Sequence, residues 1–279
     1  MQTRVTFGSA THVGVVRRAN EDQYMIARLS KVFEVLQASL ASDELKELTG
    51  QAAYLVVVSD GIGGVVAGEQ ASMMVLQQVQ RYMVEAAKWF FRWYEDPEGT
   101  DKAIEDLQKG LERIDQAIIE ASQNDPSLLG MAATLTVARI LCPDLVITHV
   151  GDSRAYLFRD NKLQQITKDH TVTQMLVDSG AITEEDAKHH HMRNIVVNVL
   201  GGKEAGVKGE IHQLILNNND RLLLCTDGLT NPVELAEIEE ILRGISDPQK
   251  ACDGLIQAAL KHGGPDNITA VIADYQTSA

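Results

Sequence analysis

Short apolar runs that end in tight-turn residues recur along the chain, and the clearest of them is residues 54–64. It reads Tyr-Leu-Val-Val-Val-Ser-Asp-Gly-Ile-Gly-Gly. Such a run predicts a strand buried on both faces, and the Asp-Gly step with a further glycine pair favours a sharp turn at its end. The Asp60 carboxylate is then delivered to an edge of the core, where the Gly61 carbonyl can act as a second oxygen ligand. Taken alone, the stretch is explained more simply by an ordinary Asp-Gly turn.

The chain repeats this arrangement, and in each case a carboxylate stands where an apolar run meets a turn. Residues 221–226 run into Asp227-Gly228, just as residues 54–59 run into Asp60-Gly61. The remaining turns are Asn20-Glu21-Asp22, Gly151-Asp152-Ser153-Arg154 and Gly263-Gly264-Pro265-Asp266-Asn267. Side chains at such junctions can converge at one end of a sandwich, so the repeated arrangement predicts a single site.

Apolar residues at a spacing of three and four predict helices between the strands. Residues 30–50 are interpreted as a helical insertion between two strands. Residues 67–94 and 101–123 form two longer amphipathic helices, which we expect to pack antiparallel on one sheet. Shorter helices are predicted at residues 171–179, 183–188, 233–243 and 248–262, with a cap box at Thr183.

Strand patterns account for most of the remaining chain. Near the N-terminus, strands are predicted at residues 3–8, 13–16 and 24–27, and the block 132–167 predicts an antiparallel meander. Residues 211–216 and 221–226 flank a polar hairpin. Strands in meanders and helices in pairs favour an α+β fold in which antiparallel sheets are covered by helical hairpins. With no repeat or interdomain break, residues 1–279 are predicted to form one domain.

Composition narrows the class of protein. The 279 residues are 44% hydrophobic, and 25 Lys and Arg against 39 Asp and Glu give a net charge of −14. This balance argues against a nucleic-acid or anionic-membrane surface and fits a protein that binds cations. Cys142, Cys225 and Cys252 lack CxxC spacing and are interpreted as buried free thiols of a reducing compartment. No apolar run approaches the ~20 residues of a membrane-spanning helix, so a cytoplasmic location is expected.

The candidate site is a cluster of carboxylates. If these groups converge, they repel one another by several kcal/mol at an effective dielectric constant of about 20, and bound cations make such a cluster tolerable. Hard oxygen ligands without His or Cys favour Mg²⁺ or Mn²⁺ over Zn²⁺. Two such ions bridged by one carboxylate can share a water, lower its pKa and direct it in line at a phosphorus atom. The cluster comprises Asp22, Asp60, Asp152, Asp227 and Asp266.

Arg17 adds a cation to this end of the predicted sheet. Strand direction places it at the same end as Glu21 and Asp22. A planar guanidinium suits the oxygens of a phosphate bidentately, whereas a surface ion pair is the alternative interpretation. With the carboxylates, Arg17 indicates metal-assisted hydrolysis of a phosphate ester.

Six motifs are spread over nearly the whole chain. They are Arg17-x-x-Asn20-Glu21-Asp22, Asp60-Gly61-x-Gly63-Gly64, Gly130-x-x-x-Thr134, Gly151-Asp152-Ser153-Arg154, Asp227-Gly228 and Gly264-x-Asp266-Asn267. In this order they resemble the metal-dependent protein phosphatase family, the type 2C serine/threonine phosphatases, in its bacterial form. Each motif is weak by itself, and the full set in register is highly specific. The resemblance implies a four-layer α-β-β-α sandwich of two antiparallel sheets flanked by helical hairpins. It also implies a binuclear Mn²⁺ or Mg²⁺ centre, and hydrolysis of phosphoserine and phosphothreonine without a phosphoenzyme.

Carried over residue by residue, the resemblance implies metal-binding roles. Asp60 would bridge two ions, the Gly61 carbonyl would complete the first, and Asp227 and Asp266 would hold the second. Asp152, together with Asp227, matches a weaker third site of bacterial members. Two further carboxylates would bind directly or through waters. The implied set is Glu21, Asp22, Asp60, Gly61, Asp152, Asp227 and Asp266.

The resemblance also implies how substrate is held. Arg17 would bind the substrate phosphate and would form the catalytic set with Asp60 and Asp227. Asn267 would orient Asp266 and its turn. Residues 167–202 correspond to a flap beside the active site that influences substrate choice. The expected partners are phosphoserine and phosphothreonine proteins, with a serine/threonine kinase or its targets as the usual candidates.

The chain departs from the family at several positions. Ile62 stands where animal members place a histidine proposed as the acid for the leaving group, so the proton would come from water or another residue. Val197-Asn198-Val199 stands where relatives often carry Thr-Arg, which puts the flap's substrate contacts in doubt. The segment 30–50 is longer than the usual bacterial connection. His189-His190-His191 could imitate a metal site and is interpreted as a solvated polar run.

Two other classes of function stay open. A regulatory protein could keep the fold without turnover, and it would bind phosphopeptide without releasing phosphate. Intact Asp60, Asp227 and Asp266 argue against it. A metal-dependent nuclease or nucleotidase would fit the oxygen ligands, but the acidic charge and the lack of a base-stacking groove disfavour it. Faster release of phosphate from nucleotides than from phosphopeptides would indicate this last class.

Overall fold

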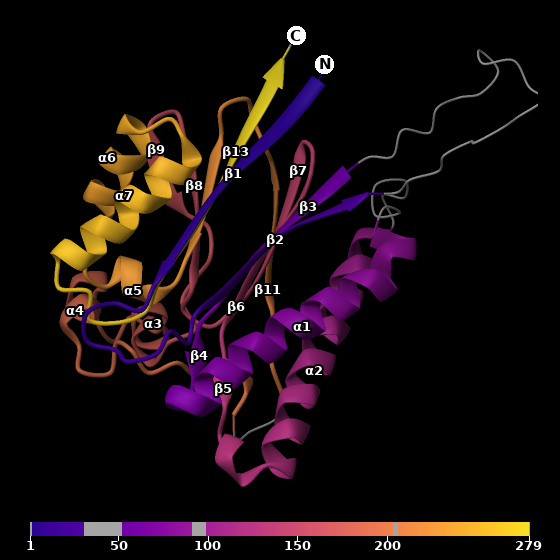
Figure 1. The fold of residues 1–279 in the computed structure, drawn as a ribbon, viewed down its shortest axis with the longest axis vertical. Helices are drawn as coiled ribbons and strands as arrows, with labels where there is room; N and C mark the ends of the chain where they lie inside the picture. The colour runs from indigo at the N-terminus through magenta and orange to yellow at the C-terminus, as the bar shows by residue number, and fades with distance from the viewer. Residues whose placement is uncertain (1, 31–51, 91–98, 203–205, 279) are drawn as a thin grey trace, which may run out of the picture.

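Two five-stranded antiparallel sheets lie face to face at the centre of the fold (Figure 1). The computed structural model describes residues 2–30, 52–90, 99–202 and 206–278. The helical insertion predicted at residues 30–50 therefore lies outside the described residues, except for Ser30, which ends a strand.

The first sheet holds both ends of the described chain. Its strands lie in the order β1 (Gln2–His12), β13 (Ile268–Ser278), β12 (Arg221–Cys225), β8 (Arg154–Arg159) and β9 (Lys162–Gln165). β1 and β13 pair antiparallel from the Gln2 and Ser278 pair to the His12 and Ile268 pair. The two termini consequently lie side by side in Figure 1.

The second sheet and a small third sheet carry the remaining strands. The second has the order β11 (Glu210–Ile215), β7 (Asp144–Val150), β6 (Leu135–Leu141), β3 (Ala52–Ser59) and β2 (Gln23–Ser30). The third joins β10 (Leu200–Gly201), β5 (Ala132–Ala133) and β4 (Gly61–Ile62). The small sheet thus connects the end of the predicted flap to the residues that follow Asp60.

Helices cover the outer face of each sheet, which completes four layers (Figure 1). α1 (Val65–Phe90) and α2 (Gly99–Asn124) pack on the second sheet, and α6 (Leu235–Gly244) and α7 (Pro248–Lys261) pack on the first. The short helices are α3 (Val172–Asp178), α4 (Glu184–His189), α5 (Asp227–Thr230) and the 3-10 turn η2 (Pro126–Leu128). The predicted α-β-β-α sandwich is confirmed, and Thr183 caps the start of α4 in a capping box, as predicted.

Residues of β3 alternate between two buried layers. Val56 and Val58 pack between the sheets, whereas Leu55 and Val57 pack with α1 and α2 on the other side. Successive side chains of a strand point to opposite faces, so a strand covered on both faces is apolar at successive positions. The prediction of a doubly buried strand that ends at Asp60 is confirmed.

The prediction of a strand at residues 13–16 is wrong. These residues follow β1 without joining a sheet, and Val15 and Val16 are each 68% exposed. Gly14 adopts a φ of +82°, which ends the extended conformation of β1. The Val15 N–H then donates to the Gly264 carbonyl at 2.8 Å, so a loop instead of a neighbouring strand holds the segment.

The predicted single meander over residues 132–167 and the hairpin over residues 211–226 are wrong in connectivity. β6 pairs with β7 in the second sheet and β8 with β9 in the first, so the chain crosses between sheets at residues 151–153. β11 and β12 also lie in different sheets, and residues 216–220 make the return crossing. A polar turn can join strands within a sheet or between stacked sheets, so the local pattern does not distinguish the two. The first crossing carries Asp152.

The structure also bears on the membrane and thiol predictions. Within the part of the chain that is described, no helix has both the length and the apolar character needed to cross a membrane. All three thiols are free, as predicted; Cys225 and Cys252 are buried, whereas Cys142 is only partly buried.

Arg221, buried at the start of β12, ties the first sheet to α6. Its Nε donates to Asp274 Oδ1 at 2.8 Å, and its Nη1 donates to the carbonyls of Leu242 at 2.5 Å and Ile245 at 2.6 Å. The last carbonyls of a helix lack intrahelical donors and form the negative end of its dipole, so a guanidinium group both satisfies and stabilises them.

Replacing Arg221 with Met keeps an apolar stem but leaves Asp274 buried without its partner. We expect the free energy of unfolding to fall by about 3–5 kcal/mol, the usual effect of removing one member of a buried ion pair. Urea unfolding measures the change. Arg243→Met, which removes a half-exposed arginine from α6, is the matched control and should change stability by less than about 1 kcal/mol. Equal losses in the two variants would contradict the anchoring role of Arg221.

Candidate functional site

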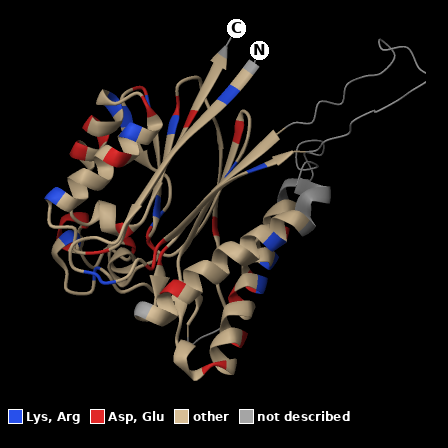
Figure 2. Ribbon diagram, viewed as in Figure 1, with Lys and Arg blue, Asp and Glu red and all other residues tan. Residues whose placement is uncertain are grey.

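A cleft of about 330 Å³ lies at the ends of β3 and β12, beside residues 151–153, where the chain crosses from one sheet to the other. In Figure 2, acidic residues gather at this end of the sheets. Asp22 does not line the cleft and is buried, with 3% exposure. The cleft is lined by the other predicted site residues, Arg17, Glu21, Asp60, Gly61, Asp152, Asp227, Asp266 and Asn267. The structure therefore brings the predicted set together from segments far apart in the sequence.

Asp60 is positioned at the end of β3 through its main chain. Its N–H donates to Thr134 Oγ1 at 2.9 Å, and the Thr134 N–H donates to the Asp60 carbonyl at 2.9 Å. Thr134 Oγ1 also shares a 2.8 Å hydrogen bond with Ser153 Oγ, the neighbour of Asp152. Because these bonds use main-chain atoms of Asp60, its carboxylate is left to line the cleft.

Asp22 is held by two threonines of the first-sheet side. Thr226 Oγ1 and Thr269 Oγ1 donate to Asp22 Oδ2 at 2.8 and 2.7 Å. The other oxygen, Oδ1, is buried and has no hydrogen-bond partner among the described residues. A buried acceptor without a partner is destabilising by about 1–3 kcal/mol, and by more when it is charged. Oδ1 is therefore suited to meet a cation.

Two glycines allow the backbone to approach the acidic cluster closely. A Cβ at Gly68, near the start of α1, would lie 1.9 Å from Glu21 Oε2, and a Cβ at Gly228 would lie 1.8 Å from the Asn267 carbonyl oxygen. The Asn267 oxygen belongs to the main chain and leaves no room for a side chain, which explains why glycine follows Asp227, whereas a side chain at Gly68 would displace the Glu21 carboxylate. Ser72 Oγ on α1 also donates to the Glu21 carbonyl at 2.6 Å, so the helix fixes the Glu21 main chain.

Asn267 joins three segments at the rim of the cleft. Its N–H donates to Asp266 Oδ1 at 2.9 Å, in keeping with the predicted role of orienting Asp266. Its Oδ1 accepts from the Glu21 N–H at 2.8 Å, and its Nδ2 donates to the carbonyls of Val13 and Ala19, each at 2.8 Å. Asn267 thus also fixes the loop before Glu21, which the sequence did not predict.

Arg17 lies at the mouth of the cleft. Its Nη2 binds Asp266 Oδ2 at 2.7 Å, and its side chain is 51% exposed. This hydrogen bond is the main reason that the pKa of Arg17 is raised. The surface ion pair considered from the sequence is therefore present, and it occurs inside the candidate site. Exposed ion pairs contribute about 0–1 kcal/mol to stability. Arg17 can therefore exchange Asp266 for another anion with little loss of free energy.

Four aspartates of the site have raised pKa values. Burial is the largest cause for Asp60, followed by the charges of Asp22 and Asp227. Burial also raises the pKa of Asp22 to about 7 and, with the charge of Asp266, the pKa of Asp227 to about 6. The pKa of Asp152 is raised by burial and by the charge of Asp227. Raised values mean that full ionisation of the cluster is unfavourable until an opposite charge arrives.

The donor set fits a hard divalent cation. Among the described residues, those lining the cleft include no histidine and no cysteine, and the converging donors are carboxylate oxygens with a backbone carbonyl nearby. Oxygen donors of this kind suit Mg²⁺ or Mn²⁺. With the unpartnered Asp22 Oδ1, they support the predicted metal centre.

The structure also shows where the residues that depart from the family pattern lie. Ile62 lines the cleft and is 36% exposed. Val196 and Val199 line the cleft from the flap, whereas Asn198 instead bonds to the main chain of Lys208. The run of histidines at residues 189–191 is not part of a candidate metal cluster within the described chain.

The sequence missed the hydroxyl groups that hold the acids. Thr226 directly precedes Asp227, and Ser153 directly follows Asp152, so a small hydroxyl residue beside these two acids was the available signal. Ser72 and Thr269 carry no such signal. The sequence also missed a cluster of His149, His170 and Glu210, because its members come from separate strands and loops.

Comparison of the chain with known proteins identifies a matching family model and similar sequences. Residues 37–262 match the family model described as Protein phosphatase 2C. The chain is 37% identical over 222 residues to the serine/threonine protein phosphatase PstP of Mycobacterium tuberculosis, which covers 80% of this chain and 40% of that protein. It is 35% identical over 221 residues to the serine/threonine phosphatase stp of Listeria monocytogenes, covering 79% of this chain and 84% of that one. The chain thus spans about two fifths of the length of the mycobacterial relative.

Solved structures give the same picture. The catalytic domain of PstP in complex with two manganese ions aligns with a TM-score of 0.74 and 31% identity, over 99% of this chain and 100% of that one. Stp1 from Staphylococcus aureus aligns with a TM-score of 0.76 and 29% identity, over 98% of this chain and 95% of that one.

The pH dependence of stability without metal tests the electrostatics of the cluster. Because the folded pKa of Asp22 is about 7 and its ordinary value is 3.8, the folded protein holds this proton more tightly than the unfolded chain. This contribution is fully present below pH 4 and is lost as the pH rises through 7. In chelator, we expect wild type to lose on the order of a few kcal/mol relative to Asp22→Asn between pH 5 and pH 8.

Urea unfolding at each pH measures this difference. Asp253→Asn, an exposed carboxylate on α7, is the control and should show no such trend. A constant or increasing advantage of wild type over Asp22→Asn would contradict the raised pKa.

Proposed function

This chain belongs to the protein phosphatase 2C family, and we propose that it is a Mn²⁺- or Mg²⁺-dependent serine/threonine phosphoprotein phosphatase. The observation that carries the proposal is the convergence of Arg17 and of every predicted carboxylate except the buried Asp22 on one cleft. Stable convergence of charges of one sign calls for bound cations, and a cation-rich cleft beside an arginine suits a phosphate monoester.

We assign the ligands as follows. Asp60 would contact both of two ions, the Gly61 carbonyl would contact the first, and Asp227 and Asp266 would contact the second. Asp152, with Asp227, would hold a third, weaker ion. Glu21 and Asp22 would complete the set, directly or through water. When bound, the ions supply Lewis-acid activation of water for direct attack on phosphorus, without a phosphoenzyme.

Side chains of the protein would bind the substrate and orient it in the cleft. Arg17 would leave Asp266 and bind the phosphate at the cleft mouth. Ile62, Val196 and Val199 form apolar surface beside it. No histidine lines the described part of the cleft, and the leaving group would take its proton from water or from another residue. Residues 167–202 would act as a flap on a single catalytic domain, 1–279.

Partner and location remain predictions. Phosphoserine and phosphothreonine proteins are the proposed substrates, a serine/threonine kinase is a proposed partner, and the cytoplasm is the proposed location. A catalytically silent phosphoprotein-binding regulator is the alternative, and the assay below separates the two.

Manganese-dependent release of phosphate from a phosphothreonine peptide is the direct test. We expect turnover that a chelator abolishes, and we expect Asp60→Asn to lower kcat by at least about 100-fold, because a group that positions the reacting atoms is lost. Asp253→Asn is the matched control and should retain full activity. Peptide binding without phosphate release by folded wild type would favour the silent regulator, and full activity in Asp60→Asn would contradict the ligand assignment.

Arg17→Ala tests the substrate contact. A charge-assisted hydrogen bond contributes about 1.5–3 kcal/mol, so we expect KM to rise roughly 10- to 100-fold with a small change in kcat. Arg18→Ala removes the adjacent exposed arginine, which does not line the cleft, and should leave KM near the wild-type value. An unchanged KM in Arg17→Ala would remove this residue from the site.

A further inference from the structure

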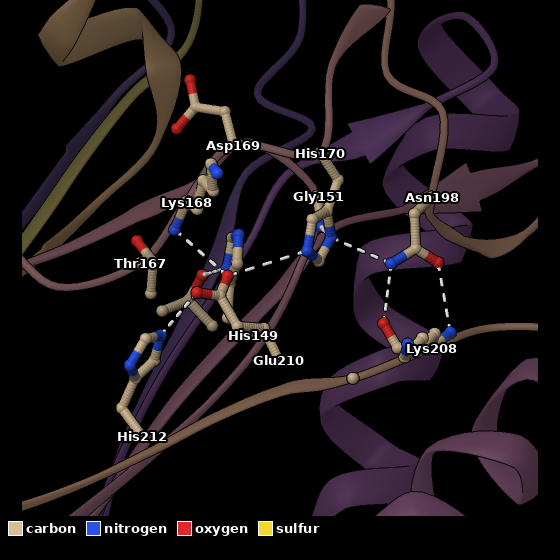
Figure 3. A network of polar contacts seen from close by, with 12 residues as sticks. His149, Gly151, Thr167, Lys168, Asp169, His170, Asn198, Lys208, Glu210 and His212 are labelled. Carbon is tan, nitrogen blue, oxygen red and sulfur yellow. Dashed lines mark hydrogen bonds and ion pairs between the residues drawn. The ribbon is translucent and has the colours of Figure 1, made fainter. Parts of the chain in front are cut away.

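Beside the cleft, His149, His170 and Glu210 place candidate ligand atoms within 4.8 Å of one another (Figure 3). His149 is fully buried, and its Nε2 has no hydrogen-bond partner among the described residues. Its ring centroid lies 4.9 Å from that of His170. Two histidines and a glutamate are a common set of zinc ligands, so this cluster must first be tested as a metal site.

The protonation state of His170 argues against a metal. The Gly151 N–H, which can only donate, lies 3.1 Å from His170 Nδ1, so Nδ1 is the acceptor nitrogen and the proton of the neutral ring is on Nε2. Nε2 is the atom that faces Glu210, at 3.7 Å, and a protonated nitrogen cannot ligate. Metal-binding histidines instead donate a hydrogen from the nitrogen away from the metal.

Asn198 completes the environment of His170 from the far end of the flap. Its Nδ2 donates to His170 Nδ1 at 2.9 Å and to the Lys208 carbonyl at 2.7 Å, and its Oδ1 accepts from the Lys208 N–H at 3.3 Å. The contacts with Lys208 on both sides fix the orientation of the amide (Figure 3). The adjacent Val197 N–H donates to the His170 carbonyl at 2.8 Å.

His170 also forms hydrogen bonds with the turn that carries Asp152. The His170 N–H donates to the Gly151 carbonyl at 2.7 Å, and the Gly151 N–H donates back to the His170 ring, so the two residues are joined by reciprocal bonds. One residue before His170, Asp169 accepts two hydrogen bonds from Arg154, at 2.8 and 2.7 Å. The turn of residues 151–154 is therefore fastened on both sides of Asp152.

We propose that His170 is a positioning residue which, with Asn198, fastens both ends of the flap to the Gly151–Asp152 turn. The position of the flap and the orientation of the Asp152 carboxylate then change together. His170 acts through the Gly151 amide and does not touch substrate. This inference rests on the proposed function, in which Asp152 holds the weakest of three ions.

Three variants separate this role from general stability. His170→Asn keeps an acceptor oxygen near the place of Nδ1, His170→Leu removes the acceptor, and Asn198→Asp directs a carboxylate oxygen at the Nδ1 lone pair. His189→Leu removes an exposed histidine of the flap and is the matched control. Two readouts that do not depend on turnover are used: Mn²⁺ binding followed by electron paramagnetic resonance, and trypsin cleavage after Lys188 or Arg193 inside the flap.

We expect His170→Leu and Asn198→Asp to weaken the lowest-affinity class of Mn²⁺ sites at least tenfold and to speed flap cleavage at least fivefold. The tighter Mn²⁺ classes should be unchanged, and His170→Asn and His189→Leu should resemble wild type. If His170→Leu fails to fold, Asn198→Asp supplies the same comparison.

Wild-type behaviour of both disruptive variants would overturn the proposal, as would equal weakening of every Mn²⁺ class or failure of His170→Asn to restore the binding lost in His170→Leu. Failure of the proposed phosphatase reaction is distinguishable, because it would appear as inactivity of wild type toward phosphopeptide. The binding and cleavage readouts would remain interpretable in that case.

Discussion

Electrostatic repulsion among carboxylates at one end of the sheets is the constraint on which the rest of the structure depends. Burial and mutual charge raise the pKa values of Asp22, Asp60, Asp152 and Asp227. Bound cations would relieve this repulsion, and hydrogen bonds to the main chain and to neutral side chains hold the acids in position. The main-chain bonds of Asp60 and the clamp of Asn267 provide this kind of support.

The two-sheet architecture makes the cluster geometrically possible. Each sheet has a buried strand that ends in an Asp-Gly pair, β3 in one and β12 in the other. Stacking the sheets brings those two ends together, and the crossing at residues 151–153 adds Asp152 between them. A meander confined to one sheet, as the local pattern suggested, would not connect the two halves of the site in this way.

The local sequence pattern predicted helices and strands well where the spacing of apolar residues follows a single period. β3, the pair α1 and α2, and the cap of α4 follow from apolar periodicity, helical spacing and capping chemistry. The errors concern pairing: residues 13–16 join no sheet, and β7 and β8 are separated into different sheets. The pairing of strands depends on contacts between residues distant in sequence. The residues of a turn between two strands do not indicate which sheet each strand joins.

By itself, the sequence predicted which acids come together and that they stand at strand ends, because turn chemistry and charge are local properties. The tertiary structure alone decided which neutral groups hold them. Thr269 reaches Asp22 from a strand near the other end of the chain, and Asn198 reaches His170 across the flap. Such hydrogen bonds require atoms to be placed within a few tenths of an ångström, and only the packing of the two sheets and the flap sets those positions.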